Sequence, residues 1–189
     1  IAVQPRATLN MASSGKITYS FPLQILVDEH KLINRWLALI PTIVKNLDLT
    51  SVTECRVIEH GLDLIRSYAD RLHHGKEEDI LFTYFDDTAD IFRVIYEDHR
   101  RARALVQEML LALDEKNSKA LAFRLLEDAV LLTEHIHKED EVLFPWLDGR
   151  LTEEEKTELT ARFDKSDKKL GLDDQKYQNF IEGLERQAT

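Results

Sequence analysis

Two stretches of the chain, HHGKEEDILFTYFD at residues 73–86 and HIHKEDEVLFPWLD at residues 135–148, share one pattern of histidine, acidic and apolar residues. Each begins with a histidine followed four positions later by a glutamate, and each ends with an apolar segment and an aspartate. Aligned without a gap, the two stretches are identical at His73/His135, Lys76/Lys138, Glu77/Glu139, Leu81/Leu143, Phe82/Phe144 and Asp86/Asp148. Such internal repetition indicates two copies of one structural unit.

A shorter pair of similar segments precedes the two long ones. VDEHK at residues 27–31 resembles YEDHR at residues 96–100, and this alignment pairs His30 with His99. The chain therefore reads as two helical hairpins of one type. In each hairpin the first helix carries a histidine near its start, and the second helix ends in H-x-x-x-E.

Apolar residues recur at steps of three and four along most of the chain, which is the spacing of amphipathic α-helices. This periodicity predicts helices at about 21–47, 52–84, 89–114 and 119–147, followed by two shorter ones at about 152–165 and 174–186. Because the connections are short, sequential helices should be antiparallel neighbours. We therefore expect an all-α fold, an antiparallel up-and-down four-helix bundle with one or two extra C-terminal helices.

The same pattern divides the chain into three parts. Residues 1–18 lack a helical pattern and the apolar core of a signal peptide, so we expect a poorly ordered leader there. Residues 19–150 form the predicted bundle. Residues 151–189 form a C-terminal helical extension, which we expect to pack on the bundle or on a protein partner, including a second copy of the chain.

Charge and composition exclude several classes of protein. With 25 Lys and Arg against 35 Asp and Glu, the net charge is −10, which argues against a nucleic-acid partner, and the densest basic cluster, HRRAR at residues 99–103, would spread its arginines around a helix. No apolar run approaches the ~20 residues of a membrane span, so we expect no membrane partner. Cys55 is the only cysteine, which fits a reducing compartment, and we expect a cytoplasmic protein.

Six ionisable residues lie on the apolar faces of the predicted helices. They are His30, His73, Glu77, His99, His135 and Glu139. A residue four positions along lies on nearly the same side of an α-helix, so each repeated glutamate should point the same way as its histidine. In an antiparallel bundle, the rise of ~1.5 Å per residue places all of these side chains within about one turn of each other, near one end.

Burying these imidazoles and carboxylates together is costly unless something compensates their polarity. A lone histidine on an apolar face is usually an ordinary core residue, but this cluster of histidines and glutamates at one depth predicts a metal centre. Imidazole and carboxylate suit iron, manganese, zinc or copper, and the lack of thiolates disfavours a soft metal. The ligands are too many for one ordinary zinc site, so we expect two metal ions, bridged by both glutamates and each bound by two histidines.

Two other histidines also lie four residues before an acidic residue. His74 precedes Glu78, and His137 precedes Glu141, but α-helical periodicity places both histidines on polar faces. The two are also out of register with each other relative to the Leu-Phe pair that follows. We therefore expect His74 and Glu78 to turn toward solvent, with His74 at most supporting the ligands from outside, and we give His137 and the isolated His60 the same interpretation.

Other residues near the predicted ligands are less strongly indicated as parts of the metal centre. Tyr96, one turn before His99, is a candidate to support the centre or its ligand, although a core aromatic is an equally good interpretation. Arg103 is a second such candidate. The carboxylates that precede the histidines are interpreted as solvated charges rather than as partners of the ligands; they are Glu29, Asp98 and Glu134.

The segments DEHKLI, HHGKEEDILF, EDHRRAR and HIHKEDEVLFP follow the order H…HxxxE…H…HxxxE, and this order resembles the hemerythrin-like, or HHE cation-binding, family over about residues 21–147. The resemblance implies a four-helix bundle around two iron ions with an oxo or hydroxo bridge, although other divalent metals such as manganese or zinc also fit. The implied ligands are His30, His73, Glu77, His99, His135 and Glu139. Ferritin-like di-iron proteins are rejected because they use Glu-x-x-His and more carboxylates.

The sequence departs from one branch of that family. Invertebrate oxygen-carrying hemerythrins carry HxxxH on the third helix, whereas Arg103 stands four residues after His99 in this chain. The fifth histidine of that pattern is therefore missing, which argues against simple reversible oxygen carriage.

Two metal ions with these protein ligands leave coordination positions open for a small molecule. We therefore expect a binding or sensing protein rather than a dedicated enzyme, with oxygen, nitric oxide or peroxide as the ligand. The alternatives are enzymatic reduction of nitric oxide or peroxide, donation of iron for the repair of iron–sulfur clusters, and an interaction module whose metal only stabilises the bundle.

Overall fold

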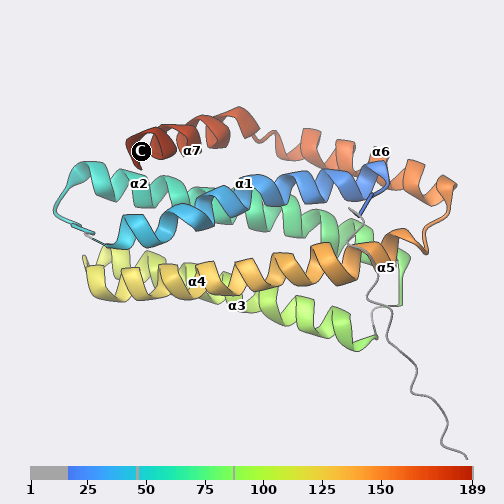
Figure 1. Ribbon diagram of the computed structural model, residues 1–189, viewed down its shortest axis with the longest axis horizontal. Helices are drawn as coiled ribbons and strands as arrows, with labels where there is room; N and C mark the ends of the chain where they lie inside the picture. The colour runs from blue at the N-terminus through green and yellow to red at the C-terminus, as the bar shows by residue number, and fades with distance from the viewer. Residues whose placement is uncertain (1–16, 46, 87, 189) are drawn as a thin grey trace, which may run out of the picture.

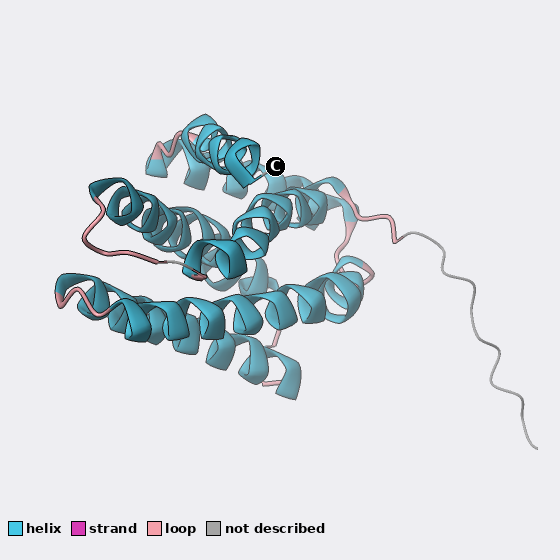
Figure 2. Ribbon diagram, turned by 60° about the vertical axis from the view of Figure 1, so that its left-hand side comes forward, coloured by secondary structure: helices cyan, strands magenta, loops and turns pink. Residues whose placement is uncertain are grey.

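The computed structural model describes residues 17–45, 47–86 and 88–188. Within these ranges every regular element is a helix, so the predicted all-α class is confirmed (Figure 2). The expectation of a poorly ordered leader at residues 1–18 falls, as far as residue 16, outside the described residues. No helix in the described ranges is both long and apolar enough to span a membrane.

Four helical rods lie side by side and form the bundle (Figure 1). In chain order they are α1 (Phe21–Val44); α2 (Val52–Asp63) continued by η1 (Leu64–His74), η2 (Glu77–Leu81) and η3 (Phe82–Tyr84); α3 (Asp90–Asp114); and α4 (Ser118–Lys138) continued by η4 (Glu139–Leu143) and α5 (Phe144–Asp148). The bounds agree with the predicted bundle helices to within a few residues, because the apolar periodicity runs through each rod.

The second and fourth rods contain stretches of π-helix, namely η1, η2 and η4. In a π-helix the backbone N–H bonds the carbonyl five residues earlier, so each turn is wider than an α turn. The backbone N–H of Gly75, for example, donates to the carbonyl of Asp70, and that of Phe144 donates to the carbonyl of Glu139. A helical face assigned from α-helical periodicity is therefore unreliable in these stretches.

Two further helices, α6 (Glu153–Leu170) and α7 (Asp174–Ala188), lie along the outside of the first two rods (Figure 1). Thr152 and Glu155 cap the start of α6 reciprocally, as a capping box. The helix ends before Gly171, whose φ of 60° is a left-handed conformation that favours glycine. It therefore runs to Leu170 rather than to the predicted residue 165.

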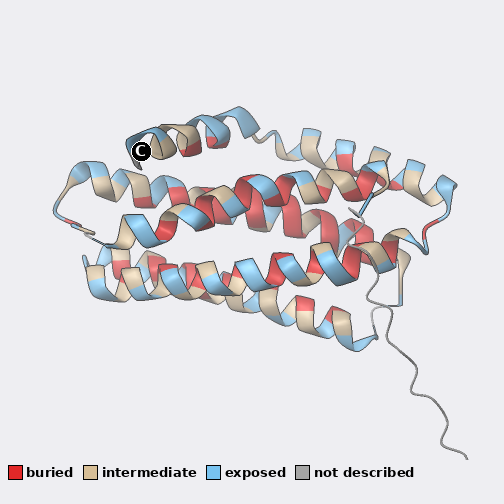
Figure 3. Cartoon of the chain, in the orientation of Figure 1, coloured by how far each residue is buried: buried red, intermediate tan, exposed pale blue. Residues whose placement is uncertain are grey.

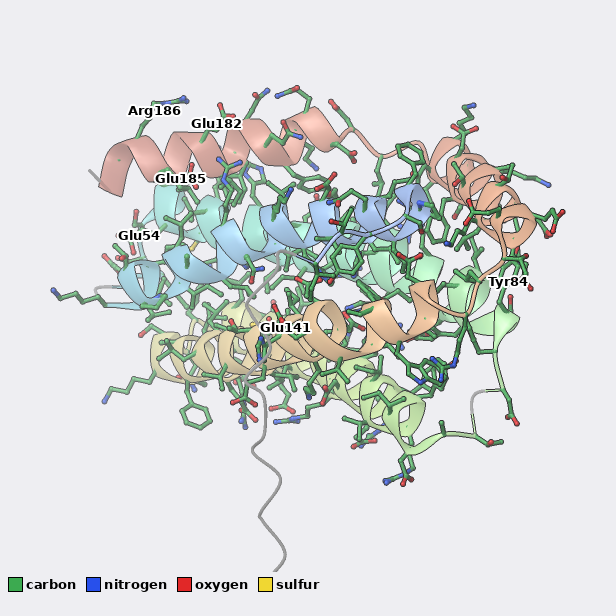
Figure 4. All side chains as sticks on the ribbon, turned by 45° about the vertical axis from the view of Figure 1, so that its right-hand side comes forward. Glu54, Tyr84, Glu141, Glu182, Glu185 and Arg186 are labelled. Atoms are coloured by element: carbon green, nitrogen blue, oxygen red, sulfur yellow. The ribbon has the colours of Figure 1, made fainter. Side chains whose placement is uncertain are left out.

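Both C-terminal helices are attached to the bundle by apolar and charged contacts. Leu159 and Phe163 of α6 are fully buried in an apolar cluster shared with the bundle. On α7, Glu185 lies on the side that faces the bundle, whereas Arg186 lies on the outer side (Figure 4). The Glu185 carboxylate pairs with Arg35 of α1 at 2.7 Å.

The buried side chains form two apolar clusters with a polar layer between them. One cluster includes Ile33, Leu72 and Leu132, and the other includes Leu26 and Leu143. In every rod the predicted metal ligands stand between residues of the two clusters along the helix. Figure 3 shows that the buried surfaces of the rods face one another. The polar layer is thus enclosed by apolar side chains on both sides.

Gly61 allows α2 to approach α1 closely. A Cβ atom at this position would lie 2.1 Å from Cη2 and 2.2 Å from Cζ2 of Trp36. Trp36 is fully buried, and its indole packs against the ring of Phe180 on α7. The absence of a side chain at Gly61 therefore makes room for the largest residue of the core.

Asp128 on α4 carries a carboxyl group without compensation in the core. The residue is fully buried, and neither carboxylate oxygen has a hydrogen-bond partner among the described residues. Burial, with a smaller contribution from the negative charge of Glu127, raises the pKa of Asp128 from 3.8 to about 7. This group therefore makes the stability of the fold depend on pH.

In the metal-free protein, Asp128→Asn is expected to remove part of that dependence. Between about pH 4 and pH 7 the folded state keeps a proton on Asp128 that the unfolded chain has lost, so the free energy of unfolding falls as the pH rises. The fall over this window is about 4 kcal/mol. Urea unfolding at pH 5 and pH 8 should show the variant gaining clearly more stability over the wild type at pH 8 than at pH 5. An equal difference at both pH values would contradict this assignment.

Candidate metal centre

The structure brings together the predicted ligands in the polar layer. They come from different rods: His30 from α1, His73 from η1, Glu77 from η2, His99 from α3, His135 from α4 and Glu139 from η4. All of them are buried, with at most 1% of their surface exposed. The structure thus places every one of these side chains where the helical pattern of the sequence predicted it.

Within this layer the Nε2 atoms of the histidines face the two glutamates. Nε2 of His30 and Nε2 of His135 lie 3.3 and 3.2 Å from Oε2 of Glu139. Nε2 of His99 lies 3.4 Å from Oε2 of Glu77, and Nε2 of His73 lies 3.7 Å from Oε1 of the same residue. Both carboxylates are therefore shared between histidines of different helices.

His74 is also part of this cluster, and the expectation that it turns toward solvent is wrong. It is buried, and its ring stacks on that of His99 with 3.8 Å between the ring centres. The ring of His135 lies 5.5 Å away. His74 belongs to the π-helix η1, whose wider turn changes the angle between consecutive side chains, so the α-helical face assignment fails here.

The donor atoms separate into two groups, and in each group the atoms lie within 4.8 Å of one another. The three-histidine group contains His74, His99, His135 and Glu77. The two-histidine group contains His30, His73, Glu77 and Glu139. Glu77 belongs to both groups, and each group is large enough to hold one metal ion. The arrangement is asymmetric, in contrast to the expectation of two histidines for each metal.

The fifth imidazole corrects one conclusion from the sequence. Arg103 does occupy the position at which an oxygen-carrying hemerythrin has a histidine on the third helix. The structure nevertheless supplies a fifth imidazole from the second rod, because His74 lies against His99. The absence of HxxxH on the third helix therefore does not reduce the number of imidazoles at the centre.

Each of the five histidines has a carboxylate beside its Nδ1 atom. The pairs are His30 with Asp140 at 2.8 Å, His73 with Glu29 at 2.9 Å, His74 with Asp70 at 3.5 Å, His99 with Glu78 at 2.6 Å and His135 with Asp98 at 3.4 Å. A carboxylate at Nδ1 keeps the proton on that nitrogen, and the Nε2 lone pair is then available to a metal ion. The five histidines thus share one orientation, with Nδ1 toward a carboxylate, and among the described residues the hydrogen bond itself forms at His30, His73 and His99.

These pairs overturn the interpretation of Glu29 and Asp98 as solvated charges. Glu29 is buried and Asp98 is half-buried, and both contact histidines of another helix. The face of a single helix does not reveal such contacts, because the partner comes from a different rod. Glu78, also expected to turn toward solvent, instead contacts His99. Only Glu134 is exposed as expected.

Basic residues lie behind most of these carboxylates. Lys76 donates to Glu29, and Lys138 donates to Asp98. Arg103 donates to Asp70 at 2.7 Å and to Glu78 at 2.9 Å, so it stands behind the carboxylates of His74 and His99. Such contacts fix the carboxylates in place and compensate their charge.

The remaining candidates do not belong to either donor group. Tyr96 is half-buried and packs edge-on against the ring of Phe82 at 5.7 Å, beside the apolar cluster that includes Leu26 and Leu143. Of the other histidines, His137 is exposed, and His60 is exposed with its ring edge-on to Phe180 of α7. Neither His60 nor His137 belongs to either donor group.

The internal repeat of the sequence extends into these supporting contacts. The acidic residue before the first histidine of each hairpin supports the second histidine of that hairpin, as Glu29 with His73 and Asp98 with His135. The acidic residue after each repeated glutamate crosses to the other hairpin, as Glu78 with His99 and Asp140 with His30. The repeated lysines and acidic residues were therefore the available signal for the contacts that the sequence reasoning missed.

Charge in the metal-free cluster is balanced by protons. Burial disfavours protonation of His30, but Asp140 and Glu139 outweigh it and raise the pKa of His30 to about 9. The pKa of His135 also rises to about 9, because Glu139 and Asp98 outweigh its burial. Burial and neighbouring imidazoles instead lower the pKa of His74 to about 3 and hold that of His73 well below its usual value.

The pKa values of the two central glutamates shift in opposite directions. Burial and the charge of Glu139 raise the pKa of Glu77 well above its usual value, which favours its protonated form. Burial also disfavours the charge of Glu139, but His135 and His30 outweigh it and lower the pKa of that residue. Metal ions would therefore replace protons on His30, His135 and Glu77.

The donor atoms fit metal ions better than they fit one another. Nε2 of His30, Nε2 of His73 and both oxygens of Glu77 and Glu139 have no hydrogen-bond partner among the described residues. A buried polar atom without a hydrogen-bond partner destabilises the fold by about 1–3 kcal/mol. This many such atoms in one layer therefore need a compensating ligand. Cations coordinated by these nitrogens and oxygens would satisfy all of them.

A helical bundle with imidazoles and carboxylates projecting into its core defines a class of metal-binding proteins. The chain belongs to the hemerythrin family, because the model of the hemerythrin HHE cation-binding domain matches residues 22–147. The match confirms the resemblance inferred from the repeated histidine motifs, and it ends before α6. Comparisons with curated proteins and with solved structures gave no match.

Proposed function

We propose that this protein binds two iron ions and reacts with, or senses, oxygen, nitric oxide or peroxide at that centre. The proposed ligands are His30, His73, Glu77, His99, His135 and Glu139, with His74 added. The observation that carries the proposal is the common orientation of the five imidazoles, each with a carboxylate at Nδ1. Such paired contacts are typical of metal-ligating histidines.

The ligand chemistry supports iron, with manganese and zinc as the competing metals. The donors are nitrogen and oxygen without sulfur, a set that suits all three metals. Bound iron would supply the electrons and the open coordination position for a small ligand. The two-histidine group has fewer imidazoles than the three-histidine group, so we place the open position at the two-histidine group.

The residues around the two-histidine group would orient its ligands and exclude water from it. Glu29 and Asp140 hold the Nδ1 protons of His73 and His30. The two apolar clusters on either side of the polar layer, which include Leu26 and Ile33, exclude bulk water. An enclosed site of this kind favours a small uncharged or singly charged ligand over a bulky substrate, which supports a binding or sensing role over a dedicated enzymatic one. We propose a cytoplasmic location on separate grounds, since Cys55, the only cysteine, fits a reducing compartment.

Reconstitution of the metal-free protein with ferrous iron under anaerobic conditions tests the proposal. We expect two iron ions per chain, measured by elemental analysis, and an absorption band in the visible or near-ultraviolet range after oxidation. Because protons occupy His30, His135 and Glu77 in the metal-free state, affinity should rise as the pH increases toward about 9. One iron ion or none per chain, or an affinity independent of pH, would overturn the proposal.

Stopped-flow mixing of the reduced iron protein with oxygen and with nitric oxide separates the roles. Reversible formation of a complex, without consumption of further equivalents, supports binding or sensing. Continued consumption in the presence of an electron donor supports reduction of the ligand instead.

A further inference from the structure

The C-terminal helix α6 reaches one of the supports of the metal centre. Oδ1 of Asp167 lies 2.8 Å from Nζ of Lys76, and Lys76 also donates to Glu29. Glu29 in turn accepts from Nδ1 of His73 at 2.9 Å. These contacts form a chain, Asp167–Lys76–Glu29–His73, from the surface of α6 to the two-histidine group. Asp167 stands outside residues 22–147, the part that matches the family.

Among the described residues, the related chain in the other hairpin has no such contact. There Lys138 donates to Asp98, which lies 3.4 Å from Nδ1 of His135. The side chain of Lys138 is 33% exposed, whereas that of Lys76 is only 1% exposed. The two lysines occupy equivalent positions of the internal repeat, so the difference arises from what covers them.

Helix α6 provides that cover. The ammonium group of Lys76 lies 5.8 Å from the ring centre of Phe163, which is itself fully buried. One turn further along the same helix, Asp167 supplies a second carboxylate to Lys76. Helix α6 therefore removes water from one lysine of the repeat and gives it an additional counter-charge.

The charge of Asp167 affects Glu29 through their shared partner. A buried ammonium ion must be compensated by hydrogen bonds and opposite charge, and here Glu29 and Asp167 divide that task. Without the charge of Asp167, Lys76 would interact more strongly with the carboxylate of Glu29. Glu29 would then accept a weaker hydrogen bond from Nδ1 of His73. A histidine whose Nδ1 proton is held less firmly is a weaker and less well oriented metal ligand.

We propose that Asp167 and Lys76 are positioning residues through which α6 strengthens His73 as a ligand, and thereby raises the metal affinity of the two-histidine group alone. The proposal rests on the two-metal function described above. It gives the C-terminal extension a part in the metal centre rather than only in stability, and it makes the two metal positions differ in affinity.

Anaerobic calorimetric titration of the metal-free full chain with ferrous iron tests this role. In Asp167→Asn one of the two binding steps should weaken about 10-fold, the lower end of the range for residues that hold a ligand from behind, and the other step should stay unchanged. Asp167→Glu, which keeps the carboxylate, should restore the first step. Loss of neither step, or equal loss of both, would overturn the proposal.

A matched control is available on the same helix. Asp164 pairs with Lys168 at the surface of α6, so Asp164→Asn removes the same charge without touching Lys76. Both steps should keep the wild-type affinity in this variant. Asp164→Asn should keep the wild-type thermal midpoint in the metal-free state, whereas Asp167→Asn should fold with a somewhat lower midpoint, because the buried Lys76 loses one of its two counter-charges. An Asp164→Asn variant that reproduced the Asp167→Asn effect would reduce the inference to one of surface charge, and so refute it.

A second measurement needs no metal and separates this proposal from the proposed function. In the metal-free protein labelled with ¹⁵N-histidine, the Nδ1 proton of His73 should exchange with solvent several-fold faster in Asp167→Asn, while the exchange rate of His135 stays the same. An unchanged rate at His73 would overturn the role of Asp167 even if the protein binds two iron ions. A wild-type protein that binds no iron would instead overturn the proposed function, and the exchange measurement would still decide whether the chain from α6 exists.

Discussion

Replacing Glu77 with glutamine is expected to abolish stoichiometric binding of both metal ions. Glu77 is the one residue that belongs to both donor groups, and its carboxylate is needed to neutralise and join the two cations. A neutral amide of the same shape provides neither the charge nor a second oxygen. We expect the affinity for ferrous iron to fall by more than the roughly 100-fold that follows from loss of a residue behind a ligand. Anaerobic titration with elemental analysis measures it.

The same substitution should leave the metal-free fold intact or stabilise it. Both oxygens of Glu77 are buried without a hydrogen-bond partner among the described residues, and burial raises the pKa of the carboxyl group, which favours its neutral form. The wild-type residue therefore serves the metal centre at the expense of stability. Asp79→Asn, an exposed change two residues away, is the control and should bind as the wild type does. Tight binding of two ions by Glu77→Gln would show that Glu77 is not a shared ligand.

Replacing Gly61 with alanine is expected to destabilise the protein by about 3 kcal/mol, the upper part of the usual range for overpacked cores. The new methyl group would overlap the indole of Trp36, with 2.1 Å between Cβ and Cη2. Trp36 is fully buried and packs against α7, so it has no free space into which to move. Chemical unfolding of the metal-free protein measures the loss.

Gly183 on α7 provides the matched control, because a Cβ atom there would meet nothing within 4 Å. Gly183→Ala should stabilise the helix by up to about 1 kcal/mol, since alanine has the higher helix propensity. Combining Gly61→Ala with Trp36→Leu should restore part of the loss, because the two side chains are in direct conflict. If Gly61→Ala costs no more than a few tenths of a kcal/mol, the close approach of α1 and α2 is not required by the fold.

The bundle was predictable because its signal is local and repeated. Residues such as Leu26, Ile33, Leu72 and Leu132 recur at helical spacing, and each contributes to a cluster that only helix packing can bury. The main ligands were predictable for the same reason, since His30 and His99 continue the apolar stripe of their helices. A polar residue on such a stripe is visible in the sequence without knowledge of the neighbouring helices.

His74 was not predictable by that reasoning. On an α-helix His73 and His74 would lie on different faces, but the turn at this point is wider than an α turn. The repeat also gave no help, because the position equivalent to His74 is occupied by the buried Ile136. The third imidazole of the three-histidine group thus has no counterpart in the second hairpin, and it breaks the symmetry that the repeat implies.

The carboxylates behind the histidines were missed for a different reason. Glu29 and Asp98 look solvated when only their own helices are considered, but each meets a histidine and a lysine from the next rod. Contacts between rods depend on helix rotation and depth, which a single sequence does not give. The identity of Lys76 and Lys138 in the repeat was nevertheless a signal, since a solvated lysine has no reason to recur at one position.

The π-helical stretches have a consequence for how the chain tolerates changes in length. A π turn closes its hydrogen bond over one residue more than an α turn does, so the second and fourth rods each carry at least one spare residue. A one-residue deletion in η1 can therefore be absorbed by conversion to α-helix, whereas the same deletion in α1 would rotate the rest of the helix by about 100°. The bundle would survive the first deletion, but His73 and His74 would no longer both face the centre. The spare residue is thus an insertion that belongs to the metal centre and not to the bundle around it.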